Sequence, residues 1–339
     1  MGAADTAIGK LCFALLASAV LTADCALADD QLAGGAEPLA AAAPASSWTG
    51  FHAGLNAGYG WGVTDRTATI AVPQYDNFGI FVAPSTSRGW SALANSGDAA
   101  VNRQGFIGGG QVGYDWQYGS SYVFGVEADI QGADIHGRGG RAGASGDVSH
   151  DSGVCITPLS CMFLRLFPES RDITRSAAGI GEIAARQDWL GTARARFGYL
   201  VTPTVLVFGS GGLAYGGVQA SAAHAFGLSE TIVATESFPT GNVTTSGTTI
   251  YPAFAGTGHA SDVRVGWTAG GGVEWMFIRN WSMKAEALYY DLGGFSVASR
   301  PVGALTVFAG TLAVANSPVT RLKFDGVIAR AGVNYHFDW

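Results

Sequence analysis

The sequence predicts an all-β protein: an eight-stranded antiparallel up-and-down transmembrane β-barrel with long extracellular loops. Its longest apolar run is 11–21, which is too short for a membrane-spanning helix. Glycine is abundant, at 50 of 339 residues, and is accompanied by 18 Phe, 11 Tyr and 9 Trp without a collagen repeat. From Trp48 onward, apolar side chains alternate with small or polar ones at the period of a β-strand.

The first residues have the pattern of a cleaved export signal. Lys10 precedes the apolar run 11–21, and Ala26-Leu27-Ala28 forms an A-x-A cleavage site. We therefore expect residues 1–28 to be a signal peptide and residues 29–47 to be an Ala- and Pro-rich periplasmic linker, with the barrel at 48–339. A lipoprotein anchored at Cys25 is the weaker alternative, because Asp24 precedes it where a small neutral residue is needed.

Eight segments alternate at period two. They are 48–62, 106–117, 122–131, 188–200, 205–218, 265–277, 281–291 and 326–339. In the sixth, Val265, Trp267 and Val273 share one face, while Glu274 lies on the other with several glycines. The fifth segment has the weakest alternation.

The distribution of charge favours a membrane barrel over a soluble one. Charged residues share a face with glycines while the opposite face is apolar and ends in aromatic residues, so the polar face is expected to point inward. The connections at 119–121, 201–204 and 278–280 are short, and those at 63–104, 132–187, 219–262 and 292–325 are long. This asymmetry is typical of periplasmic turns and extracellular loops. The segment 304–314 leaves ten strands as an alternative, unless it forms a hairpin above the membrane.

Several segments carry a resemblance to a known family. WTGFHAGLNAGYGWG, DWLGTARARFGYL, NWSMKAEALYYDLG and the final GVNYHFDW resemble the alphaproteobacterial outer-membrane β-barrel family, often called outer-membrane immunogenic proteins or porin-family small barrels. The resemblance implies an eight-stranded barrel with a structural or surface-exposed role, sometimes labelled a porin. It also implies that the barrel-assembly machinery reads the last strand, where one face carries Val333, Tyr335, Phe337 and Trp339. The family pattern ends at the aromatic residue, whereas here Asp338-Trp339 follow Phe337.

Inward-facing charges form the main candidate site. Glu127 and Asp129 on the third strand are expected beside Arg194 and Arg196 on the fourth. A second group is expected across the sixth to eighth strands, comprising Glu274, Lys284, Glu286 and Arg330. We interpret these charges as a salt-bridged polar core that fills a narrow interior, and a gate or selectivity filter is the alternative.

Two further residue pairs are candidates. His52 and His336 point inward near the periplasmic ends of the first and last strands, but a metal site would need further ligands that the sequence does not identify. Cys155 and Cys161 lie in a long loop, where an oxidising compartment favours a disulfide over two free thiols. The GGGQVG segment at 108–113 lies inside a strand with no helix after it, so no dinucleotide site and no cofactor are predicted.

These observations predict a non-enzymatic protein of the Gram-negative outer membrane that stabilises the envelope and presents its loops at the cell surface. Its expected partners are outer-membrane lipid and lipopolysaccharide, with no nucleic acid, since the net charge of −7 supplies no basic field. A narrow pore for passive diffusion of small solutes is the alternative function. A lipid-acting enzyme would instead require a histidine beside a serine and a carboxylate on the lipid-facing side.

Overall fold

The computed structural model describes residues 48–79, 85–86, 89–152, 169–307 and 311–337. These residues belong to one compact unit, Ala45–Trp339. The predicted signal peptide at 1–28, the linker at 29–47, the cysteines Cys155 and Cys161, and Trp339 all lie outside the described residues.

Nearly all of the described chain is β-strand. The elements are β1 (Gly50–Gly62), β2 (Arg66–Gly79), β3 (Ser85–Thr86), α2 (Trp90–Ala94), β4 (Gly97–Ala100), β5 (Gln104–Tyr118), β6 (Tyr122–Ser152), β7 (Glu169–Thr202), β8 (Val205–Phe238), β9 (Gly241–Ile278), β10 (Trp281–Ala298), β11 (Val302–Val307) and β12 (Thr311–His336). Within the described ranges, no helix combines the length and apolarity needed to cross a membrane.

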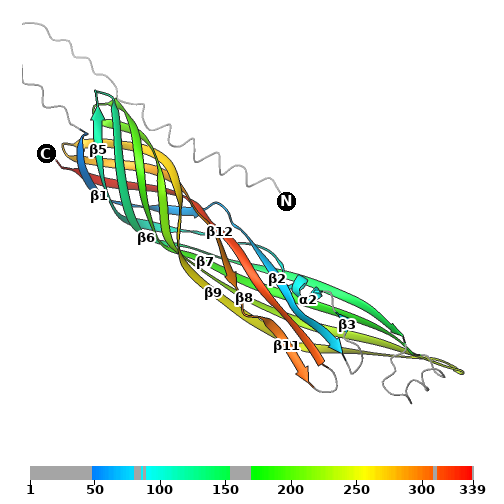
Figure 1. The fold of residues 1–339 in the computed structure, drawn as a ribbon. Coiled ribbons are helices and arrows are strands. Elements are labelled where there is room, and N and C mark those ends of the chain that lie inside the picture. The colour runs from blue at the N-terminus through cyan, green and yellow to red at the C-terminus, as the bar shows by residue number, and fades with distance from the viewer. Residues whose placement is uncertain (1–47, 80–84, 87–88, 153–168, 308–310, 338–339) are drawn as a thin grey trace, which may run out of the picture. The chain divides into compact units, whose positions relative to one another are not determined.

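Eight strands close into a ring, as the sequence predicts. The hydrogen-bonded order is β1-β5-β6-β7-β8-β9-β10-β12, and β12 returns to pair with β1 from His52↔His336 to Gly62↔Gly326. Every pairing in the ring is antiparallel. Figure 1 shows β1 and β12 side by side at the closure. The predicted fold class is therefore confirmed.

The short connections, which the sequence predicts to be periplasmic, lie where they were expected, and we call their end of the barrel the periplasmic end. Gly119 adopts a φ of +63° in the turn between β5 and β6, and Asn280 adopts a φ of +69° between β9 and β10. A positive φ suits glycine, and asparagine tolerates it better than most residues. Tight two- to three-residue turns of this kind fix the register of the strands that they join.

The outward face carries two belts of aromatic rings. Tyr199 packs against Tyr122 with ring centroids 5.6 Å apart at the periplasmic end, and Trp189 packs against Tyr215 at 6.0 Å toward the other end. Tyr199 and Trp189 are ten residues apart on β7, which is about 25 Å along the axis for a strand tilted by about 40°. This separation matches the apolar band of an outer-membrane barrel.

The predicted long loops are the main point at which the sequence prediction was wrong. Most of 132–187, 219–262 and 292–325 continues as strand: β6 and β7 stay paired out to Ser152↔Ser170, and β8 and β9 out to Phe238↔Gly241. Figure 1 shows these strands running well past the ends of β1 and β5. Beyond the membrane the outward face no longer has to be apolar, so the alternation fades although the hydrogen-bond ladder continues.

The ten-strand alternative does not hold. The segment 304–314 belongs to a hairpin of β11 and the outer end of β12, paired from Val302↔Asn316 to Val307↔Thr311. At this level β2 takes the place of β1 beside β12, as in the pair Arg321↔Ala68. The hairpin therefore lies outside the eight-stranded ring.

A short segment of the connection 63–104 is packed within the outer part of the sheet. We call residues 90–96 the plug segment; its helix α2 contacts β2, β6, β7 and β12. Asn95 is fully buried and donates to the Asn316 side chain at 3.1 Å. The Arg141 guanidinium donates to the carbonyl oxygens of Ala94, Asn95 and Ser96. One arginine of β6 thereby holds the end of α2 in place.

The barrel interior is layered. At the periplasmic end a buried apolar cluster contains Trp48, whose indole N–H donates to the Pro203 carbonyl at 3.0 Å. Toward the outer end a larger buried apolar cluster includes Ile135, Leu190 and Phe324. The charged residues predicted from the sequence lie between these two layers. The sequence prediction of a polar lumen therefore holds for this middle layer, which apolar clusters flank on both sides.

Candidate functional site: the charged layer of the lumen

The structure places all eight predicted lumen charges inside the barrel. Each is at most 5% exposed: Glu127, Asp129, Arg194, Arg196, Glu274, Lys284, Glu286 and Arg330. They reach the interior because strand side chains alternate, and each lies on the face opposite the aromatic belts. The two groups expected from the sequence form a single network.

One ion pair joins opposite walls of the ring. The Lys284 ammonium on β10 lies 2.8 Å from both carboxylate oxygens of Glu127 on β6. In the ring order, β6 and β10 are four strands apart in either direction. A direct contact between diametrically opposite strands means that side chains fill the lumen at this level.

Arg194 is the most connected cation of the network. Its guanidinium contacts Glu286 on β10 at 2.8 Å, Asp129 on β6 at 3.1 Å and the Ser210 hydroxyl on β8 at 3.1 Å. It also donates to Glu127. Three strands, β6, β8 and β10, are thereby tied to β7 through one side chain.

The other two arginines extend the network around the lumen. Arg330 on β12 lies 2.7 Å from both Glu286 and Asp129. Arg196 donates to Glu274 at 2.6 Å, and its guanidinium carbon lies 4.4 Å from the Phe208 ring centroid. Phe208 belongs to the periplasmic apolar cluster, so this stacking joins the charged layer to the layer beneath it.

The two lumen histidines lie together at the barrel seam. His52 and His336 are register partners with ring centroids 5.4 Å apart. His52 Nδ1 lies 3.3 Å from Asp115, and His336 Nε2 lies 3.0 Å from the Ser282 hydroxyl. Among the described residues, no group of three or more His, Cys, Asp or Glu side chains is arranged to hold a metal ion.

Asp115 is a member of the network that the sequence reasoning did not include. It is fully buried, and its carboxylate also lies 3.6 Å from Arg196. Its place on the polar face of the second strand was the available signal. Its partners, His52 and Arg196, lie on β1 and β7. The order of residues along the chain does not indicate that these side chains meet.

Glycines on the lumen face provide the space for these long side chains. A Cβ at Gly113 would lie 2.6 Å from the His52 ring, and one at Gly125 would lie 2.0 Å from an oxygen of Asp115. A Cβ at Gly58 would lie 2.6 Å from Arg330. These three glycines therefore make room for five carboxylates and four permanent cations inside a narrow barrel.

The proposed insertion signal lies on the outward face. Val333, Tyr335 and Phe337 are 36–44% exposed, and the Tyr335 ring contacts Trp281 at 5.2 Å and Phe337 at 5.0 Å. These rings belong to the periplasmic aromatic belt. Recognition of these residues by the barrel-assembly machinery stays a prediction.

A closed antiparallel ring with an apolar outer face, two aromatic belts and a charged interior defines an outer-membrane β-barrel protein. The comparisons place the chain in the outer membrane. It is 28% identical over 281 residues to the 31 kDa outer-membrane immunogenic proteins of Brucella melitensis and Brucella suis, covering 83% of this chain and 84% of each relative. These relatives confirm the resemblance found in the sequence. No family model matches the chain.

Two of the solved structures with detectable similarity to the chain come from Pseudomonas aeruginosa and Yersinia pestis. OprG from Pseudomonas aeruginosa has 10% identity and a TM-score of 0.33, covering 85% of this chain and 97% of its own. The attachment invasion locus protein Ail of Yersinia pestis has 10% identity and a TM-score of 0.20, covering 83% and 99%.

Proposed function

We propose that this protein is a non-enzymatic structural component of the outer membrane, which stabilises the envelope and presents its extended outer strands at the cell surface. The observation that carries the proposal is the ion pair of Lys284 and Glu127 across the full width of the lumen. An interior bridged in this way supports a filled, structural barrel and disfavours the narrow diffusion pore.

The layers on each side of the network support the same proposal. Trp48 and Leu206 are fully buried below it, and Leu190, Leu292 and Ile328 are at most 1% exposed above it. A solute crossing the barrel would have to displace two apolar layers and a set of paired charges. Breaking buried ion pairs costs several kcal/mol, so spontaneous opening would be rare.

Single-channel recording tests the filled interior. Refolded protein in a planar bilayer is expected to give no resolvable conductance steps, with a general diffusion porin as the positive control for the apparatus. Incorporation is checked by the heat-modifiable gel mobility of the folded barrel. Reproducible, ion-selective steps from the unmodified protein would overturn the proposal in favour of a pore.

A surface role is supported by the length of the paired strands beyond the aromatic belt. Tyr215 belongs to the outer belt, yet β8 continues to Phe238 and pairs with β9 up to a turn at 239–240. An epitope inserted after Thr240 should therefore be labelled by antibody on intact cells, while one inserted after Gly119 should require permeabilised cells. The immunogenic relatives are named for a property that such exposed strands would explain.

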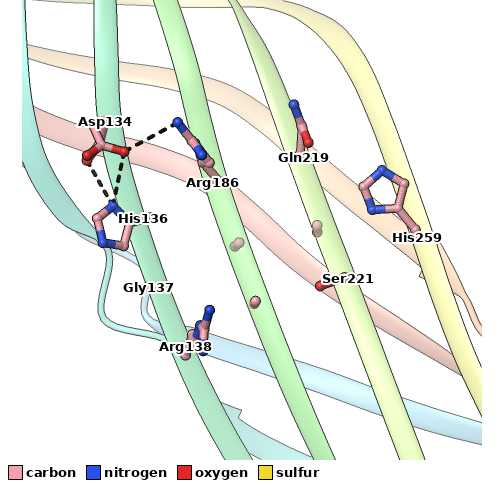
Figure 2. A pocket seen from close by; sticks show the side chains of 11 residues that line it. Asp134, His136, Gly137, Arg138, Arg186, Gln219, Ser221 and His259 are labelled. Carbon is pink, nitrogen blue, oxygen red and sulfur yellow. Dashed lines mark hydrogen bonds and ion pairs between the residues drawn. The ribbon is translucent and has the colours of Figure 1, made fainter.

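The absence of catalysis can be tested on the outward face. Ser221 on β8 and His259 on β9 are register partners there, whereas the carboxylate of Asp134 on β6 pairs with His136 and Arg186. Figure 2 shows Ser221 and His259 apart from Asp134 in this view, which supports a non-catalytic surface. Incubation with phospholipid and lipopolysaccharide should release no fatty acid. Release that is lost in Ser221→Ala would contradict the proposal.

A further inference from the structure

A polar hollow lies on the outward surface of four neighbouring strands. It has a volume of about 310 Å³. Its polar lining comprises Asp134, His136, Arg138, Arg186, Gln219, Ser221 and His259. Figure 2 shows these side chains spread over β6, β7, β8 and β9 on one face of the sheet. Its lining is mixed in charge, unlike the apolar surface below it.

The hollow lies immediately beyond the outer aromatic belt. Arg186 is three residues past Trp189 on β7, and Gln219 is four residues past Tyr215 on β8. For tilted strands these offsets correspond to about 8–10 Å along the barrel axis. Because Trp and Tyr belts mark the level of the lipid headgroups, the hollow lies in or just above the headgroup layer of the outer leaflet.

The guanidinium of Arg186 is held in a defined orientation. Its Nε lies 2.7 Å from Asp188, and its Nη2 lies 3.5 Å from Asp134. A guanidinium has five N–H donors in a planar fork, so two carboxylate contacts leave further donors for a ligand. The same fork geometry matches phosphate oxygens.

The arginines of the lining can contact an anion although the formal charge of the site is balanced. Arg138 and Arg186 line the hollow together with one carboxylate, Asp134, and the histidines are neutral at pH 7. The second carboxylate, Asp188, lies beside Arg186 and accepts a hydrogen bond from Gln219 at 2.5 Å. Neutral donors are also present, because the Ser221 hydroxyl and the Gln219 amide can bond to sugar hydroxyls.

The surface beneath the hollow is apolar. Ile130 on β6, Leu213 on β8 and Val265 on β9 are 61%, 59% and 67% exposed on the outward face. A ligand bound in the hollow would therefore find acyl-chain contacts directly below it. The geometry points to an amphiphile with an anionic polar head and several acyl chains.

We propose that this hollow binds the phosphorylated sugar headgroup of the outer-leaflet glycolipid, lipopolysaccharide, with Arg186 and Arg138 contacting a phosphate. This inference goes beyond the structural role and depends on the position of the barrel in the membrane, not on the filled lumen or the absence of catalysis. The glycolipid would then attach the barrel laterally to the leaflet around it.

The test titrates folded protein in nonionic detergent micelles with fluorescently labelled diphosphorylated lipid A and measures anisotropy. Because hydrogen bonds to charged groups are strong, the double variant Arg138→Gln/Arg186→Gln is expected to bind at least about tenfold more weakly. The control is Arg321→Gln, an exposed arginine of β12 outside the hollow. All variants should keep the heat-modifiable mobility of a folded barrel.

Three further probes identify the ligand. Dephosphorylated lipid A and phosphatidylglycerol in the same micelles are each expected to bind the unmodified protein more weakly, while millimolar inorganic phosphate should compete only poorly. Equal binding by the double variant, or equal binding of phosphatidylglycerol, would overturn the proposal. Efficient displacement by inorganic phosphate would overturn it as well, because the site would then select a free anion. None of these results depends on whether the barrel conducts.

Discussion

Replacing Arg194 by alanine tests whether the charged layer stabilises the barrel. Arg194 is 4% exposed and contacts Glu127, Asp129 and Glu286. After its loss, Lys284 still neutralises Glu127, and Arg330 still contacts Asp129 and Glu286. The layer would nevertheless hold five carboxylates and only three permanent cations.

The expected loss follows from this imbalance. Removing one partner of a buried ion pair typically costs about 3–5 kcal/mol, because a charge is left without compensation away from water. We expect Arg194→Ala to fall in this range. Adding Glu286→Gln removes one of the excess carboxylates, so the double variant should recover part of the loss. A double-mutant cycle then gives the coupling between the two residues.

The assay is urea unfolding of the barrel refolded into lipid vesicles, followed by tryptophan fluorescence and heat-modifiable gel mobility. Arg186→Ala is the matched control: its side chain is 56% exposed, and such surface ion pairs contribute little, so a change within about 0.5 kcal/mol is expected. If Arg194→Ala unfolds within about 1 kcal/mol of the unmodified protein, the layer is not a stabilising ion-pair network.

Three other perturbations address the plug and the seam. Arg141→Ala should release the plug segment, because it removes three hydrogen bonds to the end of α2. The amides of 90–96 should then exchange faster while those of β1 are unchanged. Equal exchange at 90–96 in the variant and the unmodified protein would exclude this anchoring role. Burial, and secondarily the charge of Arg141, lower the pKa of His224 to about 4. The stability that neutral His224 gives to the folded state is therefore complete above about pH 6.5 and is lost as the pH falls toward 4. The protection factors of the plug amides, which correct for the pH dependence of intrinsic exchange, should therefore fall over that interval, and His224→Phe should remove this dependence. Gly58→Val places a side chain against Arg330 and the Ala329 carbonyl at the β1–β12 seam, so little folded protein should be recovered from the outer membrane, and normal recovery would refute the steric argument.

The strand pattern explains why the membrane part of the fold was predictable. Lipid on one side and a narrow interior on the other require apolar and polar side chains to alternate along each strand. Trp267 and Glu274 are an odd number of residues apart, so the sequence alone places them on opposite faces. The eight strands and the inward direction of the charges followed from this contrast. Outside the membrane the contrast disappears: Ser221 and His259 face outward where the prediction placed a loop. A strand with polar residues on its outward face then lacks the alternation of apolar and polar residues by which a strand is recognised in the sequence.

Local alternation along the chain is enough to specify which side chains point inward, where the tight turns lie and how many strands cross the membrane. The pairing of the charges depends on the closed barrel. Glu127 and Lys284 are far apart in the chain and come from opposite walls, so their contact depends on closure of the ring and on its diameter. The outward hollow likewise requires the registers of four strands, which hydrogen bonding fixes only when the sheet is complete.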